Sequence, residues 1–267
     1  CYAESGFFHS GELLFMSKPD EGELLMSTLP DGTFQVTRRT SVSRETLPFL
    51  TRELSQTGYA LLRFEEVAHN LESDMLILAA AVGPSLADTM AYYALDADSS
   101  SELLIAHTEG VSYADGIVPY FALGCVIASD QGGETRIIDG RKAAWILLTD
   151  YPEIAKMTIA YFSLANTSER AEYPLVVEDE DYGAVLRYRS KVVTNRVQVE
   201  NQAQADNLYK VVDKTLSRCI VYCQEWRVGD FLFVNNRVTL HDRLPFVGRR
   251  RVLRVRFGDS LHQRIRF

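Results

Sequence analysis

The stretch "LLIAHTEGVSY" (residues 103–113) places a histidine and a glutamate at the end of an apolar, strand-like run. Side chains alternate between the two faces of a strand, so His107 and Glu109 are expected to point the same way as Leu103 and Ile105. A histidine and a carboxylate that face an apolar interior are costly unless a partner satisfies them. Either a bound metal ion or a direct hydrogen bond between the two side chains would satisfy them.

A second histidine strengthens the metal hypothesis. His241 ends the segment "GDFLFVNNRVTLH" (229–241), which contains a turn signal, an apolar strand and a short polar connection. Two imidazoles and one carboxylate form the facial triad that binds non-haem Fe(II) and leaves other coordination positions open. A His-x-Glu pattern also occurs in many proteins without a metal, so His107, Glu109 and His241 stay a hypothesis at this point.

The segment "RRRVLRVRF" (249–257) reads as a strand with one apolar and one charged face. The apolar face would carry Arg251 together with Leu253, Val255 and Phe257. We therefore expect the Arg251 guanidinium to point inward, where its fork suits a carboxylate. That carboxylate belongs either to a small dicarboxylate cosubstrate or to a structural Asp or Glu, and a register shift would put Arg249 or Arg250 in its place.

The segment "QGGETRIID" (131–139) adds a polar group to the predicted interior. Gly132 and Gly133 permit a tight backbone bend. Thr135 then has the same parity as Ile137, so its hydroxyl is expected on an apolar face. The hydroxyl would bind either a ligand carboxylate or its own backbone.

Many short strand-like segments follow residue 103, which predicts a mainly β fold with flanking helices, a β-sandwich or jelly roll. We expect one domain over residues 1–267. An N-terminal buttress of helices and strands would span about 1–102, with helices near 43–58 and 73–84 and a strand at 59–64. The jelly-roll core would span about 103–257 and contain a lid insertion at about 166–200, whose polar part, 166–180, reads as a loop.

Composition limits the possible partners. The chain has 267 residues, a formal net charge of −8 and a pI near 5.2, which argues against nucleic acid and anionic membrane surfaces. No apolar run is long enough to span a membrane. The first residues lack the pattern of a signal peptide, and four cysteines suggest no disulfide framework, so we expect a cytoplasmic protein with a small-molecule substrate.

Four blocks together resemble one family. "HTEG", "QGGETRIIDG", "GDFLFVNNRVTLH" and "GRRRVLRVRF" are similar to motifs of the Fe(II)- and 2-oxoglutarate-dependent dioxygenases of the taurine dioxygenase-like superfamily. The resemblance implies a double-stranded β-helix fold, with dioxygen as the oxidant. It implies that His107, Glu109 and His241 bind Fe(II), and that Thr135 and Arg251 bind the distal carboxylate of 2-oxoglutarate.

Glu109, the carboxylate of the predicted metal site, points to one branch of this superfamily. Most members of the superfamily carry Asp where this chain has Glu109, which resembles the clavaminate synthase-like branch and its amino-acid β-hydroxylases. The resemblance implies hydroxylation of an unactivated C–H bond in an amino acid or an amino-acid-derived natural-product intermediate, free or tethered to a carrier, with succinate and CO2 as coproducts. Asp242 is a candidate contact for a substrate amine. The alternatives are a desaturase or cyclase of the same cofactor class, or a non-catalytic metal-binding jelly-roll protein.

Overall fold

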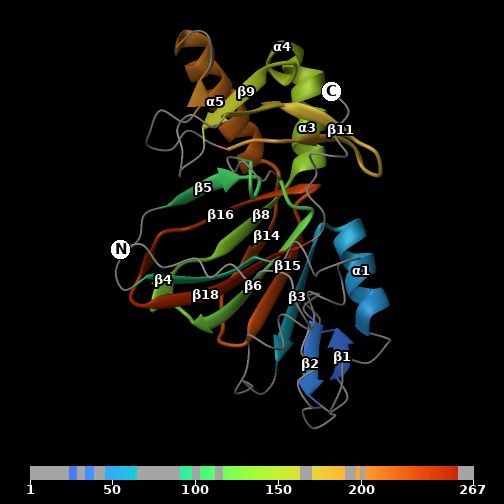
Figure 1. The fold of residues 1–267 in the computed structure, drawn as a ribbon, viewed down its shortest axis with the longest axis vertical. Helices are drawn as coiled ribbons and strands as arrows, with labels where there is room; N and C mark the ends of the chain where they lie inside the picture. Colours follow the sequence, from blue (N-terminus) through green and yellow to red (C-terminus); the bar gives the residue numbers. More distant parts are fainter. Residues whose placement is uncertain are drawn as a thin grey trace, which may run out of the picture.

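Two facing β-sheets form the larger part of the protein (Figure 1). The computed structural model describes the backbone of residues 24–28, 34–38, 46–64, 91–97, 103–111, 117–162, 170–189, 197–198 and 202–257. The larger sheet has seven strands in the order β1 (Leu24–Thr28), β2 (Phe34–Arg38), β3 (Tyr59–Phe64), β15 (Asp230–Asn235), β6 (Tyr120–Ile127), β18 (Arg250–Phe257) and β4 (Ala91–Ala97). The smaller sheet has the order β14 (Ile220–Gln224), β8 (Thr135–Asp139), β16 (Thr239–Arg243) and β5 (Leu104–His107).

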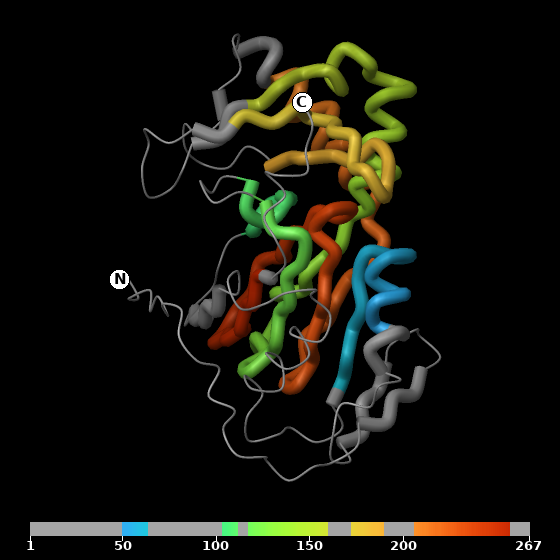
Figure 2. The backbone as a smooth tube through the Cα atoms, turned by 45° about the vertical axis from the view of Figure 1, so that its right-hand side comes forward, coloured from blue at the N-terminus to red at the C-terminus, as the bar shows by residue number. Residues whose placement is uncertain are grey.

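The strand order interleaves segments that are far apart in the sequence. β18 pairs with β6, and β16 pairs with both β5 and β8, in each case antiparallel. Figure 2 shows the green segment that contains β5 and β6 alongside the red segment that contains β16 and β18. This interleaved sandwich confirms the predicted jelly-roll fold.

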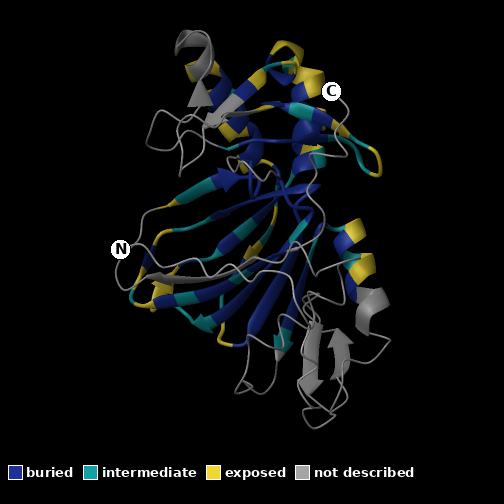
Figure 3. Cartoon of the chain, viewed as in Figure 1, coloured by how far each residue is buried: buried dark blue, intermediate teal, exposed yellow. Residues whose placement is uncertain are grey.

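Apolar side chains from both sheets meet between them. Phe121 and Leu123 of β6 and Leu232 and Val234 of β15 pack with Ile137 of β8, and all five are buried. They occupy alternate positions in their strands, so within each strand they point to the same face of the sheet. The central strands of the larger sheet are buried on both faces (Figure 3), since Phe231, Phe233, Leu253 and Val255 are buried as well.

Helix α1 (Thr46–Gln56) packs against β3 and β15 of the larger sheet. Leu50 and Leu54 of this helix are buried, as their helical spacing predicts. Gly58 follows with φ 89°, a left-handed conformation that ends the helix and starts β3. The helix and strand predicted within 43–64 are confirmed, whereas the helix predicted at 73–84 lies outside the described residues.

A second layer, inserted between β8 and β14, covers the outer face of the smaller sheet (Figure 1). Ala106, Ile138 and Leu240 of the sheet pack against buried helix residues such as Ala143 and Leu216. The inserted elements are α3 (Gly140–Asp150), α4 (Pro152–Ala155), β9 (Thr158–Phe162), β10 (Arg170–Pro174), β11 (Val176–Asp179), β12 (Gly183–Leu186), β13 (Val197–Gln198) and α5 (Gln202–Ser217).

The described part of the predicted lid contains strands where the sequence predicted a loop. β10 pairs with β9, and β11 forms a hairpin with β12. Arg237 explains why this acidic segment is ordered, because its guanidinium forms ion pairs with Asp179 and Asp181, both at 2.6 Å.

Two short strands, β7 (Gln131–Gly132) and β17 (Phe246–Val247), pair at the edge of the sandwich. Among the described helices, none has the length and apolar character needed to cross a membrane.

Candidate active site

The two histidines of the predicted metal site lie directly opposite each other on neighbouring strands. His107 is the last residue of β5 and pairs with His241 of β16. Opposed residues of an antiparallel pair place their side chains on the same face of the sheet. The ring centroids are 4.2 Å apart, so strand pairing alone brings two distant imidazoles together.

Glu109 completes the cluster from the turn that follows β5. Its Oε2 lies 3.7 Å from Nε2 of His107 and 4.0 Å from Nε2 of His241. One ligand atom from each residue lies within 4.8 Å of the other two, and each residue is at most 6% exposed. The sequence suggested that Glu109 faces the site because it continues the strand after His107. In the structure β5 ends at His107, and Glu109 reaches the site from a turn in which Gly110 has φ 82°.

The backbone of Glu109 is held by a buried asparagine that the sequence reasoning did not single out. The Glu109 N–H donates to Oδ1 of Asn236 (2.9 Å), and the Asn236 amide donates to the carbonyls of Glu109 and Val118, both at 2.8 Å. Asn236 lies in the turn between β15 and β16, two strands that bracket the site. Its only sequence signal was its place in the block "NNR".

Replacing Asn236 by alanine is expected to lower the free energy of unfolding by about 2–4 kcal/mol, because three buried hydrogen bonds are lost. It is also expected to weaken Mn(II) binding, since Glu109 loses its backbone support. Urea unfolding and metal titration measure the two effects.

The matched control is Asn235→Ala. Asn235 is equally buried in the same turn, but it bonds Leu54, Tyr182 and Arg237 instead of Glu109. The control should lose stability and keep its metal affinity within about threefold. Equal metal affinities in the two variants would contradict the role given to Asn236.

The protonation states of the cluster suit a divalent cation. The carbonyl of Ile105 lies 2.9 Å from Nδ1 of His107 and can only accept, so Nδ1 carries a proton and Nε2 is the ring nitrogen that faces the cluster. Burial and the neighbouring His107 hold the pKa of His241 well below its usual range, although Glu109 opposes this. The low pKa of His241 leaves its imidazole neutral, with a lone pair that can bind a metal ion.

Glu109 is held as a carboxylate. Burial by itself would raise the pKa of Glu109, but His107 and the positive charge of Arg254 lower it, and the net pKa lies well below its usual range. Arg254 Nη1 lies 3.0 Å and Arg256 Nε 3.7 Å from Oε1 of Glu109. Oε2 faces the two imidazoles, so the two oxygens have different neighbours.

Thr135 and Arg250 mark a second polar region between the sheets. Thr135 is buried and lies two residues before Ile137, which pairs with His241. Arg250 is 5% exposed, and its guanidinium lies over the rings of Phe246 (5.7 Å) and Trp226 (6.0 Å). Burial and the nearby charge of Arg243 lower the pKa of Arg250 to about 10.

The predicted orientation of Arg251 is wrong. Val252 packs in the core between the sheets, and Arg254 and Arg256 reach Glu109, so the even-numbered residues of β18 face inward. Arg251 is half-buried and has the opposite parity. The sequence misled because Leu253 and Val255 are buried on the outer face, so hydrophobicity does not distinguish the two faces of this strand.

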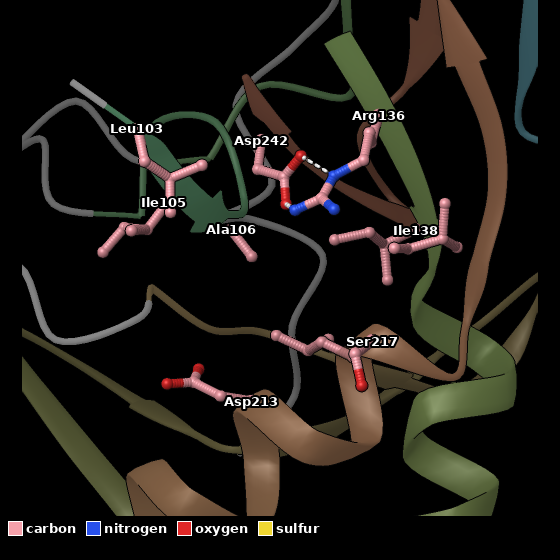
Figure 4. Close-up of a pocket in the computed structure, with 10 residues that line it drawn as sticks. Leu103, Ile105, Ala106, Arg136, Ile138, Asp213, Ser217 and Asp242 are labelled. Atoms are coloured by element: carbon pink, nitrogen blue, oxygen red, sulfur yellow. Dashed lines mark hydrogen bonds and ion pairs between the residues drawn. The ribbon is translucent and has the colours of Figure 1, made fainter. Parts of the chain in front are cut away.

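Asp242 lies away from the metal cluster, contrary to its predicted contact with a substrate amine. Successive residues of β16 alternate faces, so Asp242 points opposite to His241. Its carboxylate accepts hydrogen bonds from Nε (2.7 Å) and Nη2 (2.6 Å) of Arg136. Figure 4 shows this pair at the wall of a cavity of about 200 Å³ between the smaller sheet and α5, which carries Asp213 and Ser217.

Three arginines near the cluster were missed in the sequence. The sequence placed Arg254 and Arg256 on the charged face of the strand, opposite the predicted interior. Arg189 follows β12 and forms an isolated bridge with His107, and its charge helps to lower the pKa of His241. Arg189 carried no sequence signal, because its place beside His107 depends on the course of the inserted layer.

A jelly roll that gathers two imidazoles and a carboxylate is typical of the class of non-haem iron oxygenases. The chain belongs to the taurine catabolism dioxygenase TauD, TfdA family, whose sequence profile matches residues 52–256. It is therefore an Fe(II)- and 2-oxoglutarate-dependent dioxygenase. The clavaminate synthase-like branch stays a prediction that rests on Glu109.

Solved structures share the fold at low sequence identity. PvcB from Pseudomonas aeruginosa has a TM-score of 0.66 and 16% identity, over 93% of this chain and 94% of PvcB. A second structure of PvcB, described as an Fe, alpha-ketoglutarate dependent oxygenase from an isonitrile synthetic pathway, has a TM-score of 0.62 and 17% identity. The match covers 93% of this chain and 94% of that one. A taurine dioxygenase from Burkholderia xenovorans has a TM-score of 0.61 and 15% identity, over 88% of this chain and 90% of the dioxygenase. No curated protein matches the chain by sequence.

Proposed function

We propose that His107, Glu109 and His241 bind the iron of this dioxygenase, and that the enzyme hydroxylates a small amino-acid-like molecule. The observation that carries the iron assignment is the convergence of three buried ligand atoms within 4.8 Å. The donor set fits Fe(II), because two neutral imidazoles and one carboxylate are the ligands of the facial triad. When bound, iron would supply the chemistry by which dioxygen oxidises both 2-oxoglutarate, to succinate and CO2, and a substrate C–H bond, to C–OH.

We further propose that Arg250 and Thr135 bind the distal carboxylate of 2-oxoglutarate. Among the described residues, no carboxylate lies within ion-pair distance of Arg250, and its Nε has no hydrogen-bond partner. A buried guanidinium without a counter-charge is costly, and an anionic ligand would remove that cost. Ile137 pairs with His241, and Thr135 lies two positions from Ile137 along the same strand, about 7 Å away. This spacing leaves room for a short diacid between the iron site and Arg250.

The substrate proposal rests on charge near the iron ligands. Arg189, whose backbone bridges His107, adds positive charge near His241, which favours a substrate with a carboxylate. The acidic chain offers no basic surface for a polyanion, so the substrate is a small molecule, free or carrier-bound. Glu109 in place of Asp supports an amino acid or a natural-product intermediate derived from one.

A substrate panel tests this proposal. Free amino acids, their carrier thioesters, sulfonates and fatty acids are each incubated with enzyme, Fe(II), 2-oxoglutarate and dioxygen. We expect succinate formation to depend on an amino acid or its thioester, with a product about 16 mass units heavier. Coupling only to sulfonates or fatty acids would contradict the substrate class, and a product lighter by two hydrogens would identify a desaturase or cyclase.

A further inference from the structure

Trp226 bridges the two residues proposed to bind the distal carboxylate of 2-oxoglutarate. Its indole Nε1–H donates a hydrogen bond to Thr135 Oγ1 at 3.1 Å. Its ring also lies 6.0 Å from the Arg250 guanidinium carbon, at the outer limit of a cation–π contact. One rigid side chain therefore contacts both groups.

The direction of the bond to Thr135 has a chemical consequence. An indole N–H can only donate, so Thr135 Oγ1 must accept and its own proton points elsewhere. Among the residues that the structure describes, no acceptor receives that proton, although Thr135 is 2% exposed. A buried hydroxyl proton without an acceptor is costly, and a ligand carboxylate would accept it.

Hydrogen bonds to the buried carboxylate of Asp230 hold the loop that carries Trp226. Asp230 is fully buried and accepts hydrogen bonds from the Arg227 backbone N–H (3.0 Å) and from Gln224 Nε2 (2.8 Å), one on each side of Trp226. Arg63 of β3 binds the same carboxylate through two nitrogens, at 2.8 and 3.1 Å. These bonds fix the loop to the larger sheet and so fix the indole relative to Thr135.

We propose that Trp226 is a positioning residue for 2-oxoglutarate: its N–H orients the Thr135 hydroxyl toward the distal carboxylate, and its ring holds the Arg250 guanidinium in place. This inference rests on the proposed roles of Thr135 and Arg250. It adds a third residue to the proposed 2-oxoglutarate site.

The first test is Trp226→Phe, which keeps an aromatic ring and removes the N–H. We expect the KM for 2-oxoglutarate to rise about three- to tenfold, the range for one neutral hydrogen bond. The kcat and the KM for the primary substrate should stay within about twofold. The effect should vanish in a Thr135→Val background, because the N–H acts through the Thr135 hydroxyl. A full additional effect in that background would overturn the inference.

The second test leaves Trp226 intact. The chain has two tryptophans, and the other, Trp145 of α3, is 66% exposed. In Trp145→Phe, the fluorescence of Trp226 is the only indole signal. Titration of the Mn(II)-loaded variant with 2-oxoglutarate should change this emission with the midpoint that calorimetry gives. If calorimetry shows that 2-oxoglutarate binds and the emission does not change, the role of Trp226 is overturned and the proposed function stands. If 2-oxoglutarate does not bind to the wild-type protein, the proposed function itself is overturned.

Discussion

Glu109→Ala is expected to abolish stoichiometric Fe(II) binding and turnover. Glu109 supplies the only carboxylate of the three-residue cluster, and its Oε2 lies within 4.0 Å of Nε2 of both histidines. Loss of a group that merely supports a metal ligand costs about 10–100-fold in affinity, so loss of a ligand should cost at least about 100-fold. Without the carboxylate, Arg254 would also lose its 3.0 Å ion pair with Glu109, and its positive charge would oppose an incoming cation. His107→Ala and His241→Ala are expected to have the same effect.

Metal affinity measured with Mn(II), together with succinate formation, checks this prediction. The matched control is Asp242→Asn, which changes the residue next to His241 but acts on the opposite face of the sheet, where it weakens the pair with Arg136. The control should bind metal within about threefold of the wild-type protein. Near-native metal affinity in any alanine variant would remove that residue from the site.

The fold could be predicted because its signals are local. Leu50 and Leu54 show helical spacing, Gly58 ends the helix, and the short apolar run at 120–127 marks a buried strand. The strands within the predicted lid could not be read in the same way. Their order depends on ion pairs between Arg237 and two aspartates more than 50 positions away, a long-range contact that no local pattern shows.

The site was predictable to the extent that residue chemistry determines it. The cluster of His107, Glu109 and His241 was predicted because two imidazoles and a carboxylate are a known ligand set, and the structure brings the three together. Asn236 was missed because a buried amide that supports a backbone has no pattern of its own. Arg254 was missed for a different reason: strand parity was assigned from hydrophobicity, and in a sheet buried on both faces the inner face can be the charged one.

Arg250→Lys is expected to raise the KM for 2-oxoglutarate by at least about tenfold. Arg250 is 5% exposed, and its planar fork can bind a carboxylate through two nitrogens, whereas lysine offers a point charge. Hydrogen bonds to charged groups contribute about 1.5–3 kcal/mol, which corresponds to roughly 10- to 150-fold in affinity. Steady-state kinetics with varied 2-oxoglutarate measures the effect.

The control is Arg251→Lys, one position along the same strand. The pairing of β18 with β6 shifts register between Arg251 and Val252, where β6 skips from Ile127 to Cys125. The extra residue therefore lies in β6, and β18 keeps a regular alternation from Arg250 through Arg256. Arg251→Lys should change the KM by less than about threefold, because its side chain faces away from Thr135. A large effect at Arg251 with none at Arg250 would show that β18 is shifted by one residue, and it would move Arg254 away from Glu109 as well.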